Sequence, residues 1–165
     1  MSMEFTEIAK GMSYLTDKGA FLTAKGLNEV NTMTISWGFI GVFWGKPYFI
    51  AAVRPTRFTK TLLDEGGSFT ISIPWGCMVN ELDVCGTASG RDIDKSKVVS
   101  FKASKQVDAP VVAGCQTYFE CIIKYSDALN QNKIPVEIAQ SLYKDDFHTL
   151  YFGEIIAVYE EPAMP

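Results

Sequence analysis

Hydrophobic and polar residues alternate along several short stretches of the chain, a pattern typical of β-strands with one buried face. The clearest stretch spans residues 30–43, where Met33 and Ile35 fall on one face and Thr32 and Thr34 on the other. Other stretches, rich in β-branched and aromatic residues, predict strands at 20–25, 48–53, 68–73, 118–125 and 148–159, and a weaker one at 98–105.

Few helices are expected. The chain opens with one short helix and a loop around Gly11. Pro55 ends the strand before the next helix, whose expected N-cap is Thr56 and whose end is marked by Gly66 and Gly67. The helices predicted between strands span residues 56–63, 78–84 and 136–143.

Many strands with few helices predict a mainly β fold, a β-barrel with short helical insertions. A doubly wound parallel sheet is disfavoured because strands and helices do not alternate regularly. The length of 165 residues and the 47% hydrophobic content predict a single domain over residues 1–165.

Composition narrows the classes of function. The net charge of −4 argues against nucleic-acid binding, which needs a basic face. No apolar run approaches the length of a membrane span, and the first residues lack a basic segment followed by an apolar one, so we expect a cytoplasmic protein without a membrane partner. The four cysteines form no Cys-x-x-Cys pair, which favours reduced thiols over a zinc site.

The charges around residues 54–60 are unusual for a helix start. Arg57 and Lys60 lie in the expected first turn, near the positive end of the helix dipole, and Asp64 and Glu65 lie at the negative end. A phosphate bound at the N-terminus would resolve this conflict, because it would meet free backbone N–H groups, threonine hydroxyls and guanidinium groups. The alternative is a solvated helix with random surface charge.

Two further motifs each have two interpretations. The row of small hydroxyl side chains in residues 31–37 fits a half-solvated strand, or a surface against which a flat heterocycle lies, with Trp37 at the rim. The segment Ser89-Gly90-Arg91-Asp92 with Lys95 fits a surface loop, or a second basic contact to the anion near Arg57.

Four motifs in order resemble the FMN-binding flavin reductase-like family that includes flavoredoxin. They are residues 31–37 (NTMTISW), 53–59 (VRPTRFT), 89–95 (SGRDIDK) and 148–154 (HTLYFGE). The resemblance extends from about residue 20 to 159. It implies a split β-barrel that forms a homodimer, with FMN near the subunit interface.

The resemblance also implies roles for individual residues. The isoalloxazine ring and ribityl chain of FMN would lie against Asn31, Thr32, Met33, Thr34, Ser36 and Trp37. The phosphate would be held by Thr56, Arg57 and Thr59, with Arg54 close by and with Ser89, Arg91 and Lys95 approaching from the second loop. His148 either faces the flavin or a nicotinamide, or is a strand histidine with a satisfied hydrogen-bond partner.

The expected function is transfer of electrons from NADH or NADPH through FMN to an acceptor. The flavin carries the chemistry, so neither a catalytic side chain nor a metal site is predicted. No Gly-x-Gly-x-x-Gly follows a strand, which argues against a Rossmann domain for the nicotinamide. One alternative is a flavoredoxin-type electron carrier whose FMN is reduced by a protein partner. Another is a split barrel that binds a different cofactor or none.

Overall fold

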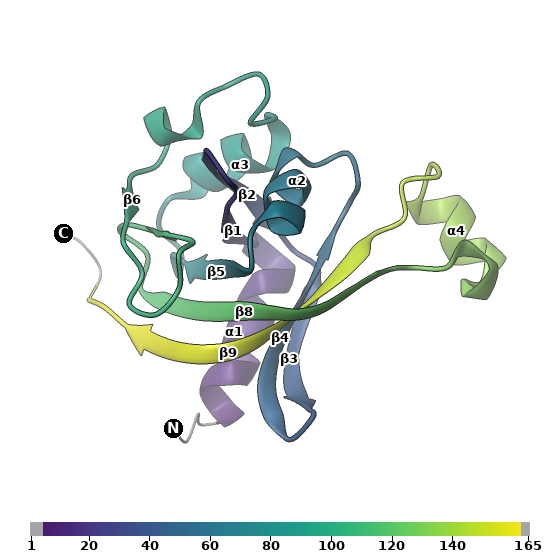
Figure 1. Cartoon of the computed structure of the whole chain (residues 1–165), viewed down its shortest axis with the longest axis horizontal. Coiled ribbons are helices and arrows are strands. Elements are labelled where there is room, and N and C mark those ends of the chain that lie inside the picture. The colour runs from purple at the N-terminus through teal and green to yellow at the C-terminus, as the bar shows by residue number, and fades with distance from the viewer. Residues whose placement is uncertain (1–4, 163–165) are drawn as a thin grey trace.

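A computed structural model describes residues 5–162, with side chains from Met12 onward. Over these residues, seven strands form one antiparallel sheet in the order β2-β1-β5-β8-β9-β4-β3, which curves around a hydrophobic core (Figure 1). The strands are β1 (Ala20–Lys25), β2 (Val30–Ile35), β3 (Gly38–Phe43), β4 (Lys46–Val53), β5 (Ser68–Ile73), β8 (Thr117–Ala128) and β9 (Thr149–Glu160). A separate ribbon pairs β6 (Phe101–Lys102) with β7 (Val111–Val112).

The helices lie between or before the strands. They are α1 (Phe5–Lys18), α2 (Phe58–Glu65), α3 (Val79–Thr87) and α4 (Val136–Leu142), with 3-10 turns η1 (Lys95–Lys97) and η2 (Gln131–Lys133). No helix among residues 5–162 is long and apolar enough to cross a membrane.

The predicted strands are confirmed, with two adjustments. The stretch 30–43 divides into β2 and β3, which pair with different strands, β1 and β4. The strand expected at 98–105 is reduced to Phe101–Lys102. The alternation in β2 is confirmed for Met33 and Ile35, which enter the core.

The opposite face of β2 is not solvated. Thr32 is fully buried, donating its hydroxyl proton to the Leu22 carbonyl oxygen at 3.1 Å and accepting from the Thr23 hydroxyl at 3.0 Å. Thr34 donates to the Leu82 carbonyl oxygen of α3 at 2.6 Å. This face of β2 is therefore mostly covered, and Thr34 on it is half-buried.

The first helix is longer than expected, because α1 continues through Gly11, where the sequence predicts a loop. A glycine in a helix costs about 1 kcal/mol, but packing of an apolar face outweighs this penalty. Leu15 of α1 is 2% exposed and belongs to the core. The helix ends before Gly19, whose φ of 82° lies in the left-handed region that glycine favours.

The predicted caps of α2 are wrong in detail. Arg57, not Thr56, is the N-cap residue, and no side chain caps the helix start. The helix does end at Gly66, but this glycine is extended, with φ −90° and ψ 171°. Glycine is required there because a Cβ would lie 2.2 Å from the Lys25 carbonyl oxygen.

Strands β8 and β9 form the longest pair of the sheet and continue beyond its other strands (Figure 1). The segment that joins them, residues 129–148, is called the arm here, and it carries α4 away from the core. The end of the arm returns to the sheet beside the end of β4, where Val53 pairs with Thr149.

Candidate functional site

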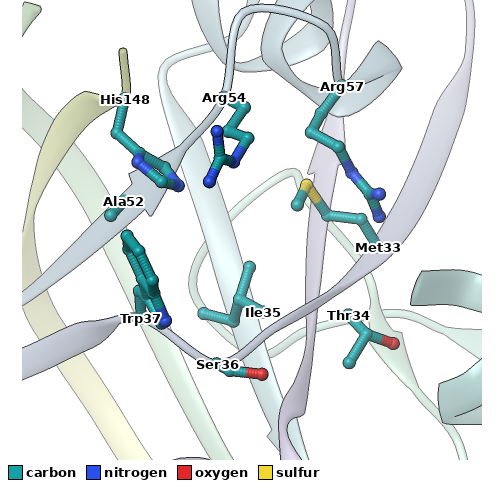
Figure 2. Close-up of a pocket in the computed structure, with 9 residues that line it drawn as sticks. All are labelled: Met33, Thr34, Ile35, Ser36, Trp37, Ala52, Arg54, Arg57 and His148. Carbon is teal, nitrogen blue, oxygen red and sulfur yellow. The ribbon is translucent and has the colours of Figure 1, made fainter. Parts of the chain in front are cut away.

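Two adjoining cavities lie along β2, between the end of β4, the start of α2 and the end of α3. The first, the aromatic cavity, has a volume of about 200 Å³ and is lined by Met33, Thr34, Ile35, Ser36, Trp37, Ala52, Arg54, Arg57 and His148 (Figure 2). The second, the basic cavity, has a volume of about 130 Å³ and is lined by Asn31, Met33, Thr56, Arg57, Phe58, Thr59, Thr87, Ala88, Ser89, Gly90 and Lys95. Met33 and Arg57 line both, so the two form one elongated site.

One end of the aromatic cavity is made of flat side chains. The rings of Trp37 and His148 lie 4.8 Å apart and are tilted by 36°, one above the other at the cavity wall (Figure 2). Tyr143 of the arm meets the His148 ring edge-on at 5.5 Å. Met33 and Ile35 supply the apolar surface opposite. This end of the site suits a planar ring system.

His148 is neutral at physiological pH. Burial lowers the pKa of its imidazole from 6.5 to about 4, and the positive charge of Arg54 acts in the same direction, while Asp146 opposes it. Its Nδ1 atom lies 3.0 Å from the Tyr143 hydroxyl oxygen.

Arg54 lines the aromatic cavity, but groups of the arm compensate its positive charge. Its guanidinium donates to an Asp146 carboxylate oxygen at 2.7 Å and to the Leu142 carbonyl oxygen at 2.9 Å. It also lies 5.0 Å from the centre of the Tyr143 ring. Arg54 is therefore not among the side chains of the basic cavity, although the sequence argument places it near the phosphate.

Lys60, which entered the argument for an anion, is also paired elsewhere. Its ammonium donates to an Asp64 carboxylate oxygen one helical turn later, at 2.7 Å. The charge conflict in α2 is thus partly relieved within the helix, and the remaining cation at its start is Arg57.

The basic cavity contains two cations that bond only to backbone carbonyls. Arg57 donates to the carbonyl oxygens of Gly86 at 2.7 Å and Cys85 at 3.2 Å. Lys95, only 4% exposed, donates to those of Thr32 at 2.8 Å and Cys85 at 3.0 Å. Among the described residues, neither forms a salt bridge with a carboxylate.

This pair leaves positive charge uncompensated beside an open space. Burial lowers the pKa of both Arg57 and Lys95, because it penalises their charged forms, and the charge of Arg57 lowers the pKa of Lys95 further. Arg57 nonetheless stays protonated. A bound anion would compensate both charges.

The remaining walls of the basic cavity fit a small anion with several oxygen atoms, such as a phosphate. Asn31 donates from its amide to the Thr59 hydroxyl at 2.8 Å, which fixes both side chains at the cavity wall. At Gly90 the chain passes so close that a Cβ would lie 2.3 Å from the Asn31 amide oxygen and 2.6 Å from the Phe58 ring. The cavity thus depends on a glycine at this position. In the part of the chain with described side chains, no three His, Cys, Asp or Glu residues are grouped to hold a metal ion.

A family model described as "Flavin reductase like domain" matches residues 12–165. The chain belongs to this family. The flavoredoxin of Methanosarcina acetivorans is 26% identical and has a TM-score of 0.69, over 87% of this chain and 68% of that one. Two other solved structures share the fold at lower identity.

The first is the FMN-binding protein of Thermus thermophilus with bound 1-cyclohex-2-enone, at 24% identity and a TM-score of 0.67 over 87% of this chain and 70% of that one. The second is the NADH:FAD oxidoreductase SgcE6 of Streptomyces globisporus C-1027, at 17% identity and a TM-score of 0.67 over 98% of this chain and 87% of that one. The predicted mainly β split barrel is confirmed.

In this flavin reductase-like chain, most of the predicted site residues come together. All line the two cavities except Thr32 and Arg91. The Thr32 hydroxyl faces the interior of the sheet, and only its backbone carbonyl reaches Lys95. Arg91 is exposed, lies 5.1 Å from the Phe58 ring and donates to the Thr56 carbonyl oxygen at 3.2 Å.

Sequence reasoning missed the contribution of the arm to this flavin reductase-like site. Tyr143 and Asp146 hold His148 and Arg54, yet Asp146 lies 92 residues from Arg54 in the chain. It also missed the carbonyl groups of Cys85 and Gly86, since backbone groups leave no side-chain pattern. The short spacing of Tyr143 and His148 was the one available signal.

Proposed function

We propose that the protein binds FMN, with the phosphate in the basic cavity and the isoalloxazine ring in the aromatic cavity. The observation that carries this proposal is the pair of cations Arg57 and Lys95. Arg57 is partly buried and Lys95 is buried, both border an open cavity, and neither has a carboxylate partner among the described residues. The adjoining cavity with stacked rings and an apolar wall supplies the second half of an elongated site.

Each charge-assisted hydrogen bond to the phosphate would contribute about 1.5–3 kcal/mol. Arg57 has further N–H groups beyond the two that bond to carbonyls, and Thr56, Thr59 and Ser89 add hydroxyls to the same cavity. Together with burial of the ring, a few such bonds reach the roughly 8 kcal/mol that micromolar affinity needs.

Bound FMN would accept electrons from NADH or NADPH and pass them to an acceptor. The chain's own residues would bind and orient it: Arg57 and Lys95 hold the negative end, while Trp37 and Met33 flank the ring. The neutral imidazole of His148 adds no charge beside the ring. The NADH:FAD oxidoreductase SgcE6 has the same fold, which is compatible with this use of it.

A second candidate function is an electron carrier of the flavoredoxin type. In this case FMN stays bound and a redox protein, rather than NADH or NADPH, reduces it. The similarity to the flavoredoxin of Methanosarcina acetivorans, at 26% identity, favours this candidate.

One experiment addresses cofactor binding and the choice between these functions. The protein is loaded with FMN and desalted, and its absorption spectrum is recorded. The rates at which it oxidises NADH and NADPH are then measured with free flavin as the acceptor. A retained flavin spectrum with turnover supports the oxidoreductase. A retained spectrum without turnover of either nucleotide supports the carrier, and a colourless protein contradicts both.

We further propose that the protein is a homodimer with β3 in the interface. β3 is an end strand of the sheet, and its side chains are largely exposed: Phe39 is 51% exposed, Val42 78% and the adjacent Trp44 62%. An exposed apolar edge strand tends to pair with another chain. A second copy of the protein would cover β3.

The cytoplasmic setting expected from the sequence is part of the same proposal. The cysteines Cys77, Cys85, Cys115 and Cys121 are free thiols, a state compatible with a reducing compartment. NADH and NADPH would be available there.

A further inference from the structure

His148 is held in one orientation by groups from two parts of the chain. Its ring lies on Trp37 at 4.8 Å, and Tyr143 of the arm meets it edge-on at 5.5 Å. The Tyr143 hydroxyl oxygen lies 3.0 Å from Nδ1. Arg54 ties the same part of the arm down, through Asp146 at 2.7 Å and the Leu142 carbonyl oxygen at 2.9 Å.

The direction of the bond between Tyr143 and His148 follows from the chemistry of the two groups. A phenol is a better proton donor than a neutral imidazole N–H, and an imidazole nitrogen is a better acceptor than a phenol oxygen. The Tyr143 hydroxyl has no other acceptor among the described residues. Tyr143 therefore donates to Nδ1, and the proton of the neutral imidazole lies on Nε2.

We propose that Tyr143 is a positioning residue that fixes the Nε2–H tautomer of His148, so that a hydrogen-bond donor faces the aromatic cavity. The ligand group that fits is a carbonyl oxygen on a ring lying in this cavity. Met33 and Ile35 supply the apolar surface on which such a ring would lie. This inference rests on the proposed function for the identity of the ring.

The carbonyl has two possible sources, the flavin itself or a substrate that lies on it. Both present the same chemistry to Nε2–H. The Thermus thermophilus structure, which contains 1-cyclohex-2-enone, supplies a suitable probe of the second kind, and cyclohexene is the matched ring without the oxygen.

His148 is the single histidine of the chain, so a protein labelled with ¹⁵N in its imidazole gives one pair of ring nitrogen signals. Two-dimensional NMR at neutral pH then shows which nitrogen carries the proton. The expected result is a protonated Nε2 and an unprotonated Nδ1. A protonated Nδ1 in the wild-type protein would overturn the proposal.

The variant Tyr143→Phe removes the hydroxyl and keeps the ring that stacks on Phe147 at 4.6 Å. We expect both tautomers to be populated in this variant. The matched control is Tyr125→Phe, which removes a surface hydroxyl bonded to Asp127 and leaves the tautomer unchanged. A tautomer that stays fixed in Tyr143→Phe would contradict the assigned role, and if this variant does not fold, the wild-type spectrum still decides.

Titrations with ligands distinguish the two sources of the carbonyl. A shift of the Nε2–H signal on addition of FMN alone identifies a flavin carbonyl. A shift that appears only when cyclohex-2-enone is added to the FMN-loaded protein, and not with cyclohexene, identifies a substrate carbonyl. Tyr143→Phe then binds the enone about twofold more weakly, because only the Nε2–H tautomer can donate and about half of the variant carries it. No shift with either ligand overturns the proposed contact.

Retention of FMN after desalting is measured in the same samples. Loss of FMN from the wild-type protein would contradict the proposed function. The tautomer measurement needs no flavin, so it tests the role of Tyr143 separately.

Discussion

The cations of the site differ in what compensates them, and this difference decides which of them a ligand can use. Arg54 and Lys60 each have a carboxylate partner, Asp146 and Asp64. Arg57 and Lys95 bond to carbonyl oxygens, which stabilise a charge without neutralising it. The sequence reveals the number of cations near α2, but not which of them are paired.

Lys95 and Lys97 lie in the same 3-10 turn and form a matched pair for a test. Lys95 is buried beneath the basic cavity, and Lys97 is exposed. We expect Lys95→Met to weaken FMN binding about tenfold, since loss of one cation that faces the phosphate across the cavity costs on the order of 1–2 kcal/mol. Isothermal titration calorimetry measures the dissociation constant. Lys97→Met should leave it unchanged, and equal effects of the two substitutions would refute a specific role for Lys95.

The lowered pKa of His148 makes stability depend on pH. The folded-state pKa of about 4 lies below the unfolded value of 6.5, so between these values the unfolded chain binds more protons, and stability falls as pH decreases through this window. We expect His148→Gln to lose less stability than the wild type between about pH 6.5 and 4. Urea unfolding at a series of pH values measures this difference, and parallel curves would show that His148 is not the responsible group.

At the scale of elements, the loop after α3 approaches β2 and α2 so closely that Gly90 is required. A Cβ at this position would meet Asn31 and Phe58. We expect Gly90→Ala to destabilise the fold by about 1–3 kcal/mol, the usual range for overpacking, and to weaken FMN binding because the cavity wall moves.

Gly67 supplies the control for this substitution, because a Cβ there would meet nothing within 4 Å. Gly67→Ala should change the free energy of unfolding by no more than about 0.5 kcal/mol. Urea unfolding and FMN titration of both variants make the comparison. If Gly90→Ala bound FMN like the wild type, the loop would not form the cavity wall.

Alternation and turn residues predict most elements because these signals are local. The strands at 20–25, 68–73 and 148–159 follow from them directly. The continuation of α1 through Gly11 does not, since packing of Leu15 against the core decides it. Local signals also misplace the N-cap of α2 by one residue, because a turn closed by the Arg57 N–H and the Arg54 carbonyl oxygen, at 3.1 Å, precedes the helix.

At the scale of the whole molecule, the motifs predict which residues meet, but not which hydrogen-bond and charge partners these residues have. Residues 31–37, 53–59 and 89–95 converge on the two cavities as the family resemblance implies. Residues 129–147 of the arm lie outside every motif, so the contact of Asp146 with Arg54, 92 residues away in the chain, could not be predicted. Long-range pairing of this kind depends on the folded topology rather than on spacing.

The proposed dimer has a test with a matched control. Val42 on β3 and Leu27 in the turn between β1 and β2 are both 78% exposed. We expect Val42→Lys to shift the protein from dimer to monomer, because it places a charge in the proposed interface, and Leu27→Lys to have no effect. Sedimentation equilibrium measures the mass. A wild-type monomer, or a dimer insensitive to Val42→Lys, would contradict the proposed interface.

The central claim is that Arg57 holds the phosphate of FMN, and riboflavin, which lacks the phosphate, tests it most directly. The measurement is the dissociation constants of FMN and riboflavin for the wild type and for Arg57→Ala. We predict that Arg57→Ala weakens FMN binding by at least about tenfold, as expected for loss of a charge-assisted hydrogen bond, with much less effect on riboflavin. Equal losses for the two ligands would contradict the claim.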